Sequence, residues 1–408
     1  MICKERRNLE KKLRDTVGLY LALLLFLGLG FAHPLPAADP YIIGLSTART
    51  GGAAMSYTPA SEGFRIYMEK INDAGGINGH PVKVMLEDDG GQGAKTGSNI
   101  KMFIGAGAHL VMVTSASATY APAIAEAKRA NVPIVIGGGS VSTPQAYPPK
   151  PDPLVFVATD KGASTESNKA VQSIAELATG PVTLGMVVMD LPIATAIAKR
   201  SGELAAAKGW KVVESRFPMT AVDLTSIADE WIQKGVNWGC EHGPAGTRLL
   251  YPALMKRGWK GNFLFISESF NYLTDMKADN LYATAAVAPL ELNLPEHKEV
   301  IDAAKKYKAS PLLTETLWGW EAARMVEKTL RSAGWPVNTK KLLEVMNNIE
   351  SDNRPLGKVT KWTADDHTGS FVWRVYKWDK KQGKVVPATD WWRGSATGDV
   401  VQKVGPKL

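Results

Sequence analysis

Short apolar runs alternate with amphipathic stretches along most of this sequence, and this alternation limits the folds that the chain can adopt. Residues 41–45 form an apolar run, and residues 61–73 repeat apolar side chains at the spacing of one helical face. The same unit then recurs, with strands predicted at 82–86, 110–113 and 134–136 and helices at 94–105 and 120–130. Strands that alternate with helices of this length form βαβ units, so we predict an α/β fold with parallel sheets.

A second α/β run follows a proline-rich break. Residues 144–153 contain five prolines, which suits neither a helix nor a central strand. Beyond the break, strands are predicted at 154–157, 183–189, 211–214, 236–238 and 263–266, and helices at 166–178, 194–208, 224–234 and 246–256. Two successive runs predict two Rossmann-like lobes rather than one very wide sheet.

The first 38 residues resemble a secretory leader. A basic segment at 4–14 precedes an apolar run at 17–32, which is shorter than the roughly 20 residues of a membrane-spanning helix. We therefore predict a signal peptide at 1–38, cleaved between 32 and 40, and a periplasmic protein. An uncleaved membrane anchor is the alternative.

Charges of both signs are well mixed in the remaining chain. The whole sequence has 48 Lys and Arg against 40 Asp and Glu, and removing the six basic and three acidic residues of 1–38 leaves 42 against 37. Nucleic-acid binding needs a clustered basic stripe, so we expect no nucleic-acid partner.

Motifs for catalysis, metals or cofactors are lacking in the sequence. The stretch 88–96 resembles a phosphate-binding loop, but Ala94 stands where such a loop needs a glycine directly before Lys95. The stretch 365–369, which contains His367, falls between two strand-like runs and is interpreted as a turn. We expect no catalytic residue, no metal and no cofactor.

The chain has two cysteines, Cys3 in the leader and Cys240, so the exported form has no internal disulfide. His242 follows Cys240 closely, which leaves a nucleophile or a metal ligand as an alternative. We expect instead a partly buried thiol just after the strand at 236–238.

Two hydroxyl-rich loops follow predicted strands. Residues 114–120 and 137–140 begin where the strands 110–113 and 134–136 end, and ligands of open α/β sheets bind at the carboxyl ends of the strands. Ser117 and Ser140 are therefore candidate ligand contacts. The alternative is that both serines only cap helices.

Several stretches resemble the Leu/Ile/Val-binding protein family, the solute receptors of ABC importers for branched-chain amino acids. The resemblance is carried by residues 43–45, 50–51, 62–63, 71–79 and 87–89, and above all by the Asn-Asp-Ala-Gly-Gly-Ile-Asn-Gly stretch. It implies a type I periplasmic binding fold with a three-crossover hinge. The N-terminal lobe would then comprise 39–158 and 289–357, and the C-terminal lobe 159–288 and 358–408.

The resemblance also implies roles for single residues. Ser117 corresponds to the serine that binds the ligand carboxylate, Gly138 and Ser140 to a carbonyl and hydroxyl pair, and Glu268 to the acid that binds the α-ammonium. Tyr57 corresponds less closely to a tyrosine of the first loop, since its spacing is one residue longer. The family's pattern is absent at 191–194 and at 240–242, and its disulfide is missing.

These observations predict a monomeric transport receptor, without enzymatic activity, that traps a small hydrophobic amino acid between its lobes and presents it to an ABC permease. Because the pocket residues depart from the family's pattern, an aromatic or other small carboxylate, or an amide, remains an alternative ligand. A secreted hydrolase and a sensor domain are alternatives of a different class.

Overall fold

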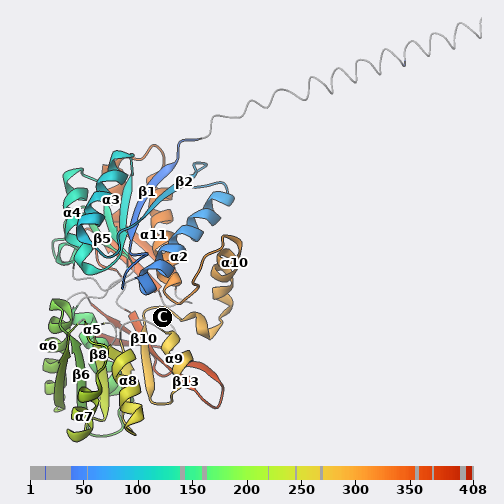
Figure 1. Ribbon diagram of the computed structural model, residues 1–408. Coiled ribbons are helices and arrows are strands. Elements are labelled where there is room, and N and C mark those ends of the chain that lie inside the picture. Colours follow the sequence, from blue (N-terminus) through green and yellow to red (C-terminus); the bar gives the residue numbers. More distant parts are fainter. Residues whose placement is uncertain are drawn as a thin grey trace, which may run out of the picture. The chain divides into compact units, whose positions relative to one another are not determined.

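The computed structural model describes residues 38–52, 54–137, 143–158, 163–218, 220–243, 246–266, 270–353, 358–369, 372–395 and 401–406, together with Arg14 (Figure 1). Contacts divide the chain into Met1–Asp39 and Pro40–Leu408, and the helices and strands of the two lobes belong to the second unit. The predicted leader lies almost entirely outside the described residues. Among the described residues, no helix combines the length and apolarity that crossing a membrane requires.

The first sheet is parallel throughout. It consists of β1 (Tyr41–Thr47), β2 (Val82–Asp88), β3 (Leu110–Thr114), β4 (Ile134–Ile136) and β5 (Val155–Val157), in the order β2-β1-β3-β4-β5. Thr47 at the end of β1 lies opposite Asp88 of β2 on one side and Thr114 of β3 on the other. Three strands therefore end at one level, and the loops that follow them begin side by side.

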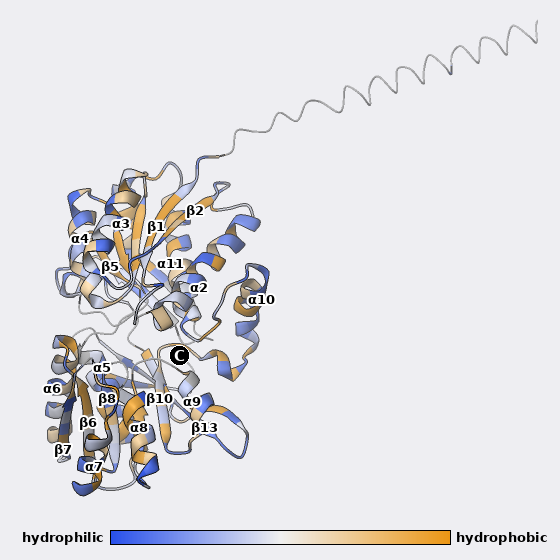
Figure 2. Cartoon of the chain, in the orientation of Figure 1, coloured by the Kyte–Doolittle hydropathy of each residue, from blue (hydrophilic) through white to orange (hydrophobic). Residues whose placement is uncertain are grey.

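Helices cover both faces of this sheet (Figure 1). The core on one face contains α3 (Gly93–Gly105) and α4 (Tyr120–Arg129), and the core on the other contains α2 (Ala54–Asp73), α10 (Lys298–Lys306), α11 (Thr316–Ala333) and α12 (Thr339–Met346). Along β3, Leu110 and Met112 pack in the second core, and Val111 and Val113 in the first. Because both faces are covered, β3, β4 and β5 are apolar along almost their whole length, as Figure 2 shows, whereas the edge strand β2 also contains charged residues.

Helices α2 and α11 pack so closely that their contact requires glycine. A Cβ atom on Gly319 would lie 1.6 Å from the carbonyl oxygen of Ala60, and one on Gly63 would lie 2.0 Å from that of Thr316. No side chain larger than hydrogen fits at either position without moving a helix backbone. The contact fixes α2, which follows the first loop, against the core.

The second sheet has a parallel part and an antiparallel extension. The strands β6 (Thr183–Met189), β7 (Lys211–Phe217), β8 (Trp238–His242), β9 (Asn262–Phe265) and β10 (Leu281–Ala285) are parallel in the order β7-β6-β8-β9-β10. The strands β13 (Val372–Asp379), β14 (Lys384–Pro387), β15 (Trp391–Gly394) and β16 (Val401–Gly405) extend it from β10 with antiparallel pairing. Helices α5 (Ala163–Leu177) and α6 (Pro192–Ala207) belong to the core on one face, and α7 (Thr225–Gln233), α8 (Gly246–Lys256) and α9 (Asn271–Met276) to the core on the other.

Between β10 and β13 the chain returns to the first lobe. Val287 and Ala288 already belong to the core of α2 and α11, and β11 (Asn348–Asn353) pairs antiparallel with β12 (Lys358–Thr363). The Trp362 indole donates a hydrogen bond to the Val157 carbonyl oxygen at 2.8 Å, which ties β12 to β5. Short 3-10 turns lie at Ser117–Thr119, Pro144–Ala146, Leu290–Leu292 and Pro295–His297.

The predicted α/β class and the two lobes are confirmed, and two element boundaries are wrong in ways that matter for the site. Helix α2 begins at Ala54 and not at 61, so Tyr57 belongs to a helix, because the glycines of the preceding loop, Gly51 and Gly52, end before the helix and the residues from Ala54 to Thr58 include no glycine. Strand β8 covers Trp238–His242 and not 236–238. Cys240 therefore lies inside a strand that pairs on both sides, where it is fully buried.

Candidate functional site

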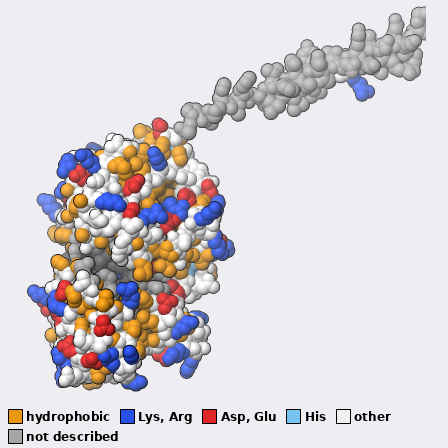
Figure 3. All heavy atoms as spheres, in the orientation of Figure 1, with side chains coloured by type: hydrophobic (Ala, Val, Ile, Leu, Met, Phe, Trp, Pro, Cys, Tyr) orange, Lys and Arg blue, Asp and Glu red, His pale blue; other side chains and the backbone are white. Residues whose placement is uncertain are grey.

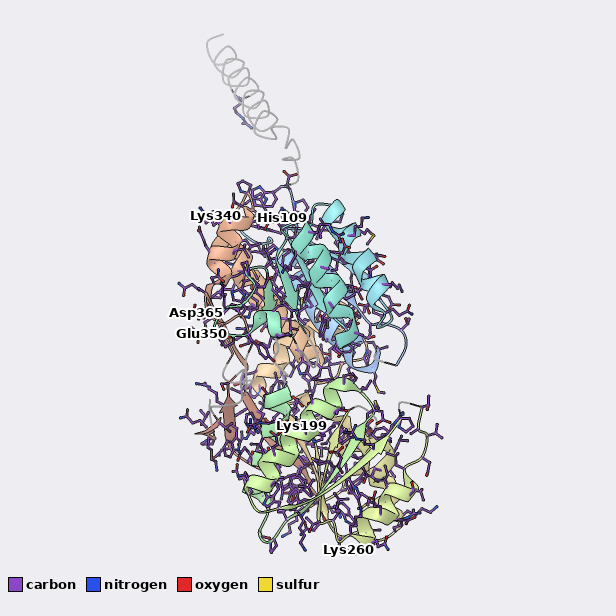
Figure 4. The ribbon with its side chains drawn as sticks, turned by 90° about the vertical axis from the view of Figure 1, so that its left-hand side faces the viewer. His109, Lys199, Lys260, Lys340, Glu350 and Asp365 are labelled. Carbon is purple, nitrogen blue, oxygen red and sulfur yellow. The ribbon has the colours of Figure 1, made fainter. Side chains whose placement is uncertain are left out.

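Two consecutive carboxylates join the loops at the carboxyl-terminal edge of the first sheet. Asp88 ends β2, and Asp89 begins the loop that follows. Ligands of open α/β sheets bind at this edge. The opposite, amino-terminal edge is marked in Figure 4 by His109, which directly precedes β3.

Asp89 connects three segments through its side chain. One carboxylate oxygen accepts hydrogen bonds from the Ser115 hydroxyl at 2.6 Å and the Gly91 N–H at 2.8 Å. The other oxygen accepts a hydrogen bond from the Ser46 hydroxyl at 2.9 Å. The Asp89 side chain is fully buried and forms no ion pair within the described residues, so neutral donors there stabilise its charge.

Asp88 fixes the loop that follows β1. It accepts hydrogen bonds from the N–H groups of Arg49 at 2.8 Å and Thr50 at 3.2 Å, and from the Thr50 hydroxyl at 2.7 Å. Desolvation acts to raise the pKa of Asp88, but the hydrogen bonds from Thr50, Arg49 and Gly90 outweigh it. The pKa of Asp88 therefore lies well below its usual value.

Ser117 presents a hydroxyl to solvent at the same edge. It is the first residue of a 3-10 turn, its side chain is exposed, and its hydroxyl has no hydrogen-bond partner among the described residues. Helix α4 begins three residues later, at Tyr120, with Thr119 as its N-cap residue. Ser117 is therefore not the cap of α4, which removes the structural alternative left open for this serine.

Two tyrosines beside Asp89 remain protonated. Burial, and then the charge of Asp89, raise the pKa of Tyr57 to about 12. Burial raises the pKa of Tyr120 well above its usual value, with smaller contributions from Tyr57 and Asp89, and its hydroxyl donates to the Ser115 carbonyl oxygen at 2.8 Å. Both phenols are therefore hydrogen-bond donors at physiological pH.

In the second lobe, the carboxyl-terminal end of β8 provides polar residues. The opposite, amino-terminal edge of this second sheet is marked in Figure 4 by Lys260, which lies just before β9. The Cys240 sulfur lies 3.7 Å from Nε2 of His242, and both residues are fully buried. Burial, and then Glu241, raise the pKa of the thiol, while burial lowers the pKa of His242 to about 3. A nucleophilic cysteine needs a lowered thiol pKa and access to a substrate, so neither the raised pKa nor the full burial of Cys240 supports a nucleophile at this position.

Glu241 stabilises the start of α8. Its carboxylate accepts hydrogen bonds from the N–H of Thr247 at 2.8 Å and from the Thr247 hydroxyl at 2.7 Å, in the first turn of that helix. A carboxylate at a helix N-terminus interacts favourably with the helix dipole. Cys240, Glu241 and His242 stand where the resembled family has an aromatic residue. All three are fully buried in this lobe.

A buried ion pair in α5 was not found from the sequence. The Lys169 ammonium lies 2.9 Å from the Glu166 carboxylate, and the two side chains are only 2% and 3% exposed. Thr165, Ser167 and Asn168 are buried as well. A spacing of three residues between opposite charges usually indicates an exposed helix face, so the pattern alone gave no signal of burial.

His367 has a structural role. Its buried ring stacks on Phe156 with 3.9 Å between the ring centroids, and its Nδ1 lies 3.0 Å from the carbonyl oxygens of Asp152 and Val155. The residue attaches the turn after β12 to β5, in agreement with the interpretation of 365–369 as a turn. No cluster of three or more metal-binding side chains occurs in the described part of the chain.

The structure describes two of the five predicted site residues. Ser117 and Tyr57 both follow strands at the carboxyl-terminal edge of the first sheet. Gly138, Ser140 and Glu268 lie outside the described residues. On the face drawn in Figure 3, acidic and basic side chains are interspersed.

Comparisons with known proteins identify relatives by family and by fold. The family described as periplasmic binding protein matches residues 40–384, whereas no curated protein matches the sequence. A branched-chain amino acid ABC transporter protein from Thermus thermophilus with bound valine has a TM-score of 0.76 and 16% identity, and the match covers 88% of this chain and 98% of that one.

Two further solved structures share the fold. The substrate-binding protein LivJ from Streptococcus pneumoniae, in complex with isoleucine, has a TM-score of 0.69 and 18% identity over 90% of this chain and 100% of that one. A solute-binding protein from Rhodopseudomonas palustris, in complex with 3,4-dihydroxybenzoic acid, has a TM-score of 0.72 and 15% identity over 85% and 95%. The family consists of transporter receptors, not of enzymes, that deliver small molecules to a membrane permease, and its members are exported to the periplasm. The chain belongs to the periplasmic binding protein family and has the type I periplasmic binding fold.

Proposed function

We propose that this receptor binds a small solute that carries a carboxylate, with a branched-chain amino acid as the first candidate. The observation that carries the proposal is the exposed Ser117 hydroxyl, which has no partner among the described residues, at the ligand-binding edge of the first sheet. Ser140 and the backbone near Gly138 would complete the carboxylate site, and Tyr57 would add a phenolic donor.

An amino acid also brings an ammonium group into the cleft, and a buried charge without a partner costs several kcal/mol. Glu268, three residues after the end of β9 in the sequence, is the proposed partner for that ammonium. The N-terminal lobe would then supply neutral donors and the C-terminal lobe a single negative charge.

An aromatic or other small carboxylate, or an amide, is the alternative ligand. The Thermus and Streptococcus neighbours bind valine and isoleucine, and the Rhodopseudomonas neighbour binds 3,4-dihydroxybenzoic acid. All three are similar to this chain at the same low level of identity. The departures at 191–194 and 240–242 favour a side-chain pocket unlike that for leucine.

We further propose that residues 1–38 are a cleaved leader and that the exported chain is a monomer. The lobes would meet at a three-crossover hinge, with 39–158 and 289–357 in the first lobe and 159–288 and 358–408 in the second. Closure around the ligand would present the receptor to its ABC permease, without chemical change of the ligand.

A thermal-shift screen of the chain without residues 1–38 tests the ligand. Leucine, isoleucine, valine and 3,4-dihydroxybenzoate are compared, because a ligand that binds only the folded state raises the melting temperature. Isothermal titration of the best probe then measures three variants. We expect Ser117→Ala to weaken the binding free energy by about 0.5–3 kcal/mol and Glu268→Gln to weaken it by about 2–5 kcal/mol. The control Ser98→Ala, on the exposed face of α3, should leave the affinity unchanged.

The outcomes separate the ligand classes. An unchanged affinity for Glu268→Gln, together with weaker binding by Ser117→Ala, would mean that the ligand has no amine and would favour the aromatic carboxylate. If Ser117→Ala binds every stabilising probe as tightly as the parent protein, the proposed carboxylate site is wrong. Recovery of a chemically altered probe after incubation would contradict a receptor function.

A further inference from the structure

Asp89 connects the loop that carries Ser117 to the rest of the first lobe. The residues around Ser117 form local hydrogen bonds with one another. The Thr119 N–H and hydroxyl both donate to the Ala116 carbonyl oxygen, at 2.9 and 2.7 Å. This turn is attached to the sheet edge through Ser115, whose hydroxyl donates to Asp89 at 2.6 Å. Ser115 is fully buried, so the bond is protected from water.

Asp89 is itself held from several directions. Its N–H donates to the Thr47 carbonyl oxygen at 2.8 Å, and its side chain accepts from Ser46 of β1 and from the Gly91 N–H. The Ser46 hydroxyl also accepts a hydrogen bond from the Asn99 side chain of α3 at 3.1 Å. The carboxylate is therefore a fixed point, tied to β1, to α3 and to its own loop.

We infer that Asp89 is a positioning residue of the solute site, which holds the 115–120 turn so that Ser117 is ordered before the solute arrives. This inference rests on the proposed function of Ser117. A loop that is ordered in advance loses little conformational freedom on binding, so the hydrogen bond between Ser115 and Asp89 should increase the affinity for the solute. Asp89 acts through Ser115 and need not touch the solute.

Asp88 gives a matched control in the adjacent position. It is also a carboxylate that accepts backbone and hydroxyl hydrogen bonds, but its partners Arg49 and Thr50 belong to the loop after β1. Removing the Asp88 carboxylate should therefore loosen the loop after β1, whereas removing the Asp89 carboxylate should loosen the 115–120 turn.

Hydrogen–deuterium exchange of the ligand-free protein tests the ordering without any knowledge of the solute. We expect Asp89→Ala and Ser115→Ala to speed exchange in peptides covering 115–120 by about tenfold or more, which corresponds to a lost hydrogen bond to a charged group. Asp88→Ala should instead speed exchange in peptides covering 48–52. Asp89→Asn retains an oxygen for Ser115 and Gly91, so it should preserve most of the protection at 115–120.

Ligand affinity tests the link to Ser117. For the best probe among leucine, isoleucine, valine and 3,4-dihydroxybenzoate, Ser117→Ala should weaken binding in the parent protein but have little further effect in the Asp89→Ala background. Such non-additivity is the signature of residues that act together. Two independent, additive losses would overturn the inference, and so would unchanged exchange at 115–120 in a folded Ser115→Ala protein.

Failure of this inference and failure of the proposed function remain distinguishable. If no carboxylate probe stabilises the parent protein, the proposed ligand class is wrong, whereas the exchange experiment still reports on Asp89. If a probe binds through Ser117 but exchange at 115–120 does not respond to Asp89→Ala or Ser115→Ala, only the positioning role is wrong.

Discussion

Replacing Gly319 by alanine should destabilise the first lobe, although the same change in most helices stabilises a protein. In α11 the new Cβ atom would lie 1.6 Å from the Ala60 carbonyl oxygen, while real Cβ atoms essentially never approach closer than 3.0 Å. The backbones of α2 and α11 must therefore move apart by about 1.4 Å, because neither atom belongs to a flexible side chain.

The expected size of the effect is the difference between two terms. Overpacking of a close-packed contact costs about 1–3 kcal/mol, and a shift of two helix backbones falls at the upper end of that range. Alanine gains about 1 kcal/mol over glycine through its helix propensity. We therefore expect a net loss of about 2 kcal/mol in the unfolding free energy.

Urea unfolding followed by circular dichroism measures the change, with Gly105→Ala in α3 as the control. A Cβ on Gly105 meets nothing within 4 Å, so this variant should be equal to the parent protein or up to about 1 kcal/mol more stable. A Gly319→Ala protein that is as stable as Gly105→Ala would refute the close contact between α2 and α11.

Four other predictions concern buried and processed residues. Lys169→Met should lower the free energy of unfolding in urea by about 3–5 kcal/mol, because it leaves Glu166 buried without its cation. Adding Glu166→Leu should restore much of this loss, and equal stabilities of the single and double variants would contradict the prediction. The pKa of His242 falls to about 3 in the folded state, so only the unfolded chain binds this proton between about pH 6.5 and 3, and the unfolding free energy should fall as the pH falls through that window. His242→Phe should make that dependence measurably flatter in an acid-unfolding titration. Cys240 is fully buried with a raised thiol pKa, so a thiol reagent should label it only after denaturation. N-terminal sequencing of exported protein should begin between residues 33 and 41, and finding Met1 on membrane-bound material would contradict a cleaved leader.

The fold class was predictable because periodicity is a local property. Apolar runs of strand length followed by helical spacing occur within single segments, and the sequence of such segments is enough to predict parallel βαβ units. The antiparallel extension by β13 to β16 was not predicted, since nothing local distinguishes a strand that joins its neighbour in the opposite direction. Strand β8 was placed too early, because its Cys-Glu-His end reads as polar and becomes a buried strand only between β6 and β9.

The site was predictable only in part. The hydroxyl-rich loop that carries Ser117 is visible in the sequence because it directly follows a predicted strand, and the structure places that loop at the carboxyl-terminal edge of the first sheet. A ligand contact by Ser117 stays a prediction. The contacts of Asp89 are not visible in the sequence, because its partners Ser46 and Ser115 are 43 and 26 residues away and meet it only across the sheet. In the sequence, Asp88 and Asp89 appear as two equivalent acids before a glycine-rich turn. In the structure, Asp88 holds the loop after β1 and Asp89 holds the loop after β3.

By itself, the sequence determined the class of fold, the two lobes and the family that the chain resembles, and it predicted the sheet edge at which a ligand is expected. Each of these depends on residues close together in the chain or on a contiguous stretch. Only the tertiary structure decided which charges are buried, that Glu166 and Lys169 form a pair out of water, and that a side chain at Gly319 would clash with the backbone of α2. Burial and contact between distant segments depend on how strands and helices pack, and packing is set by the whole chain at once.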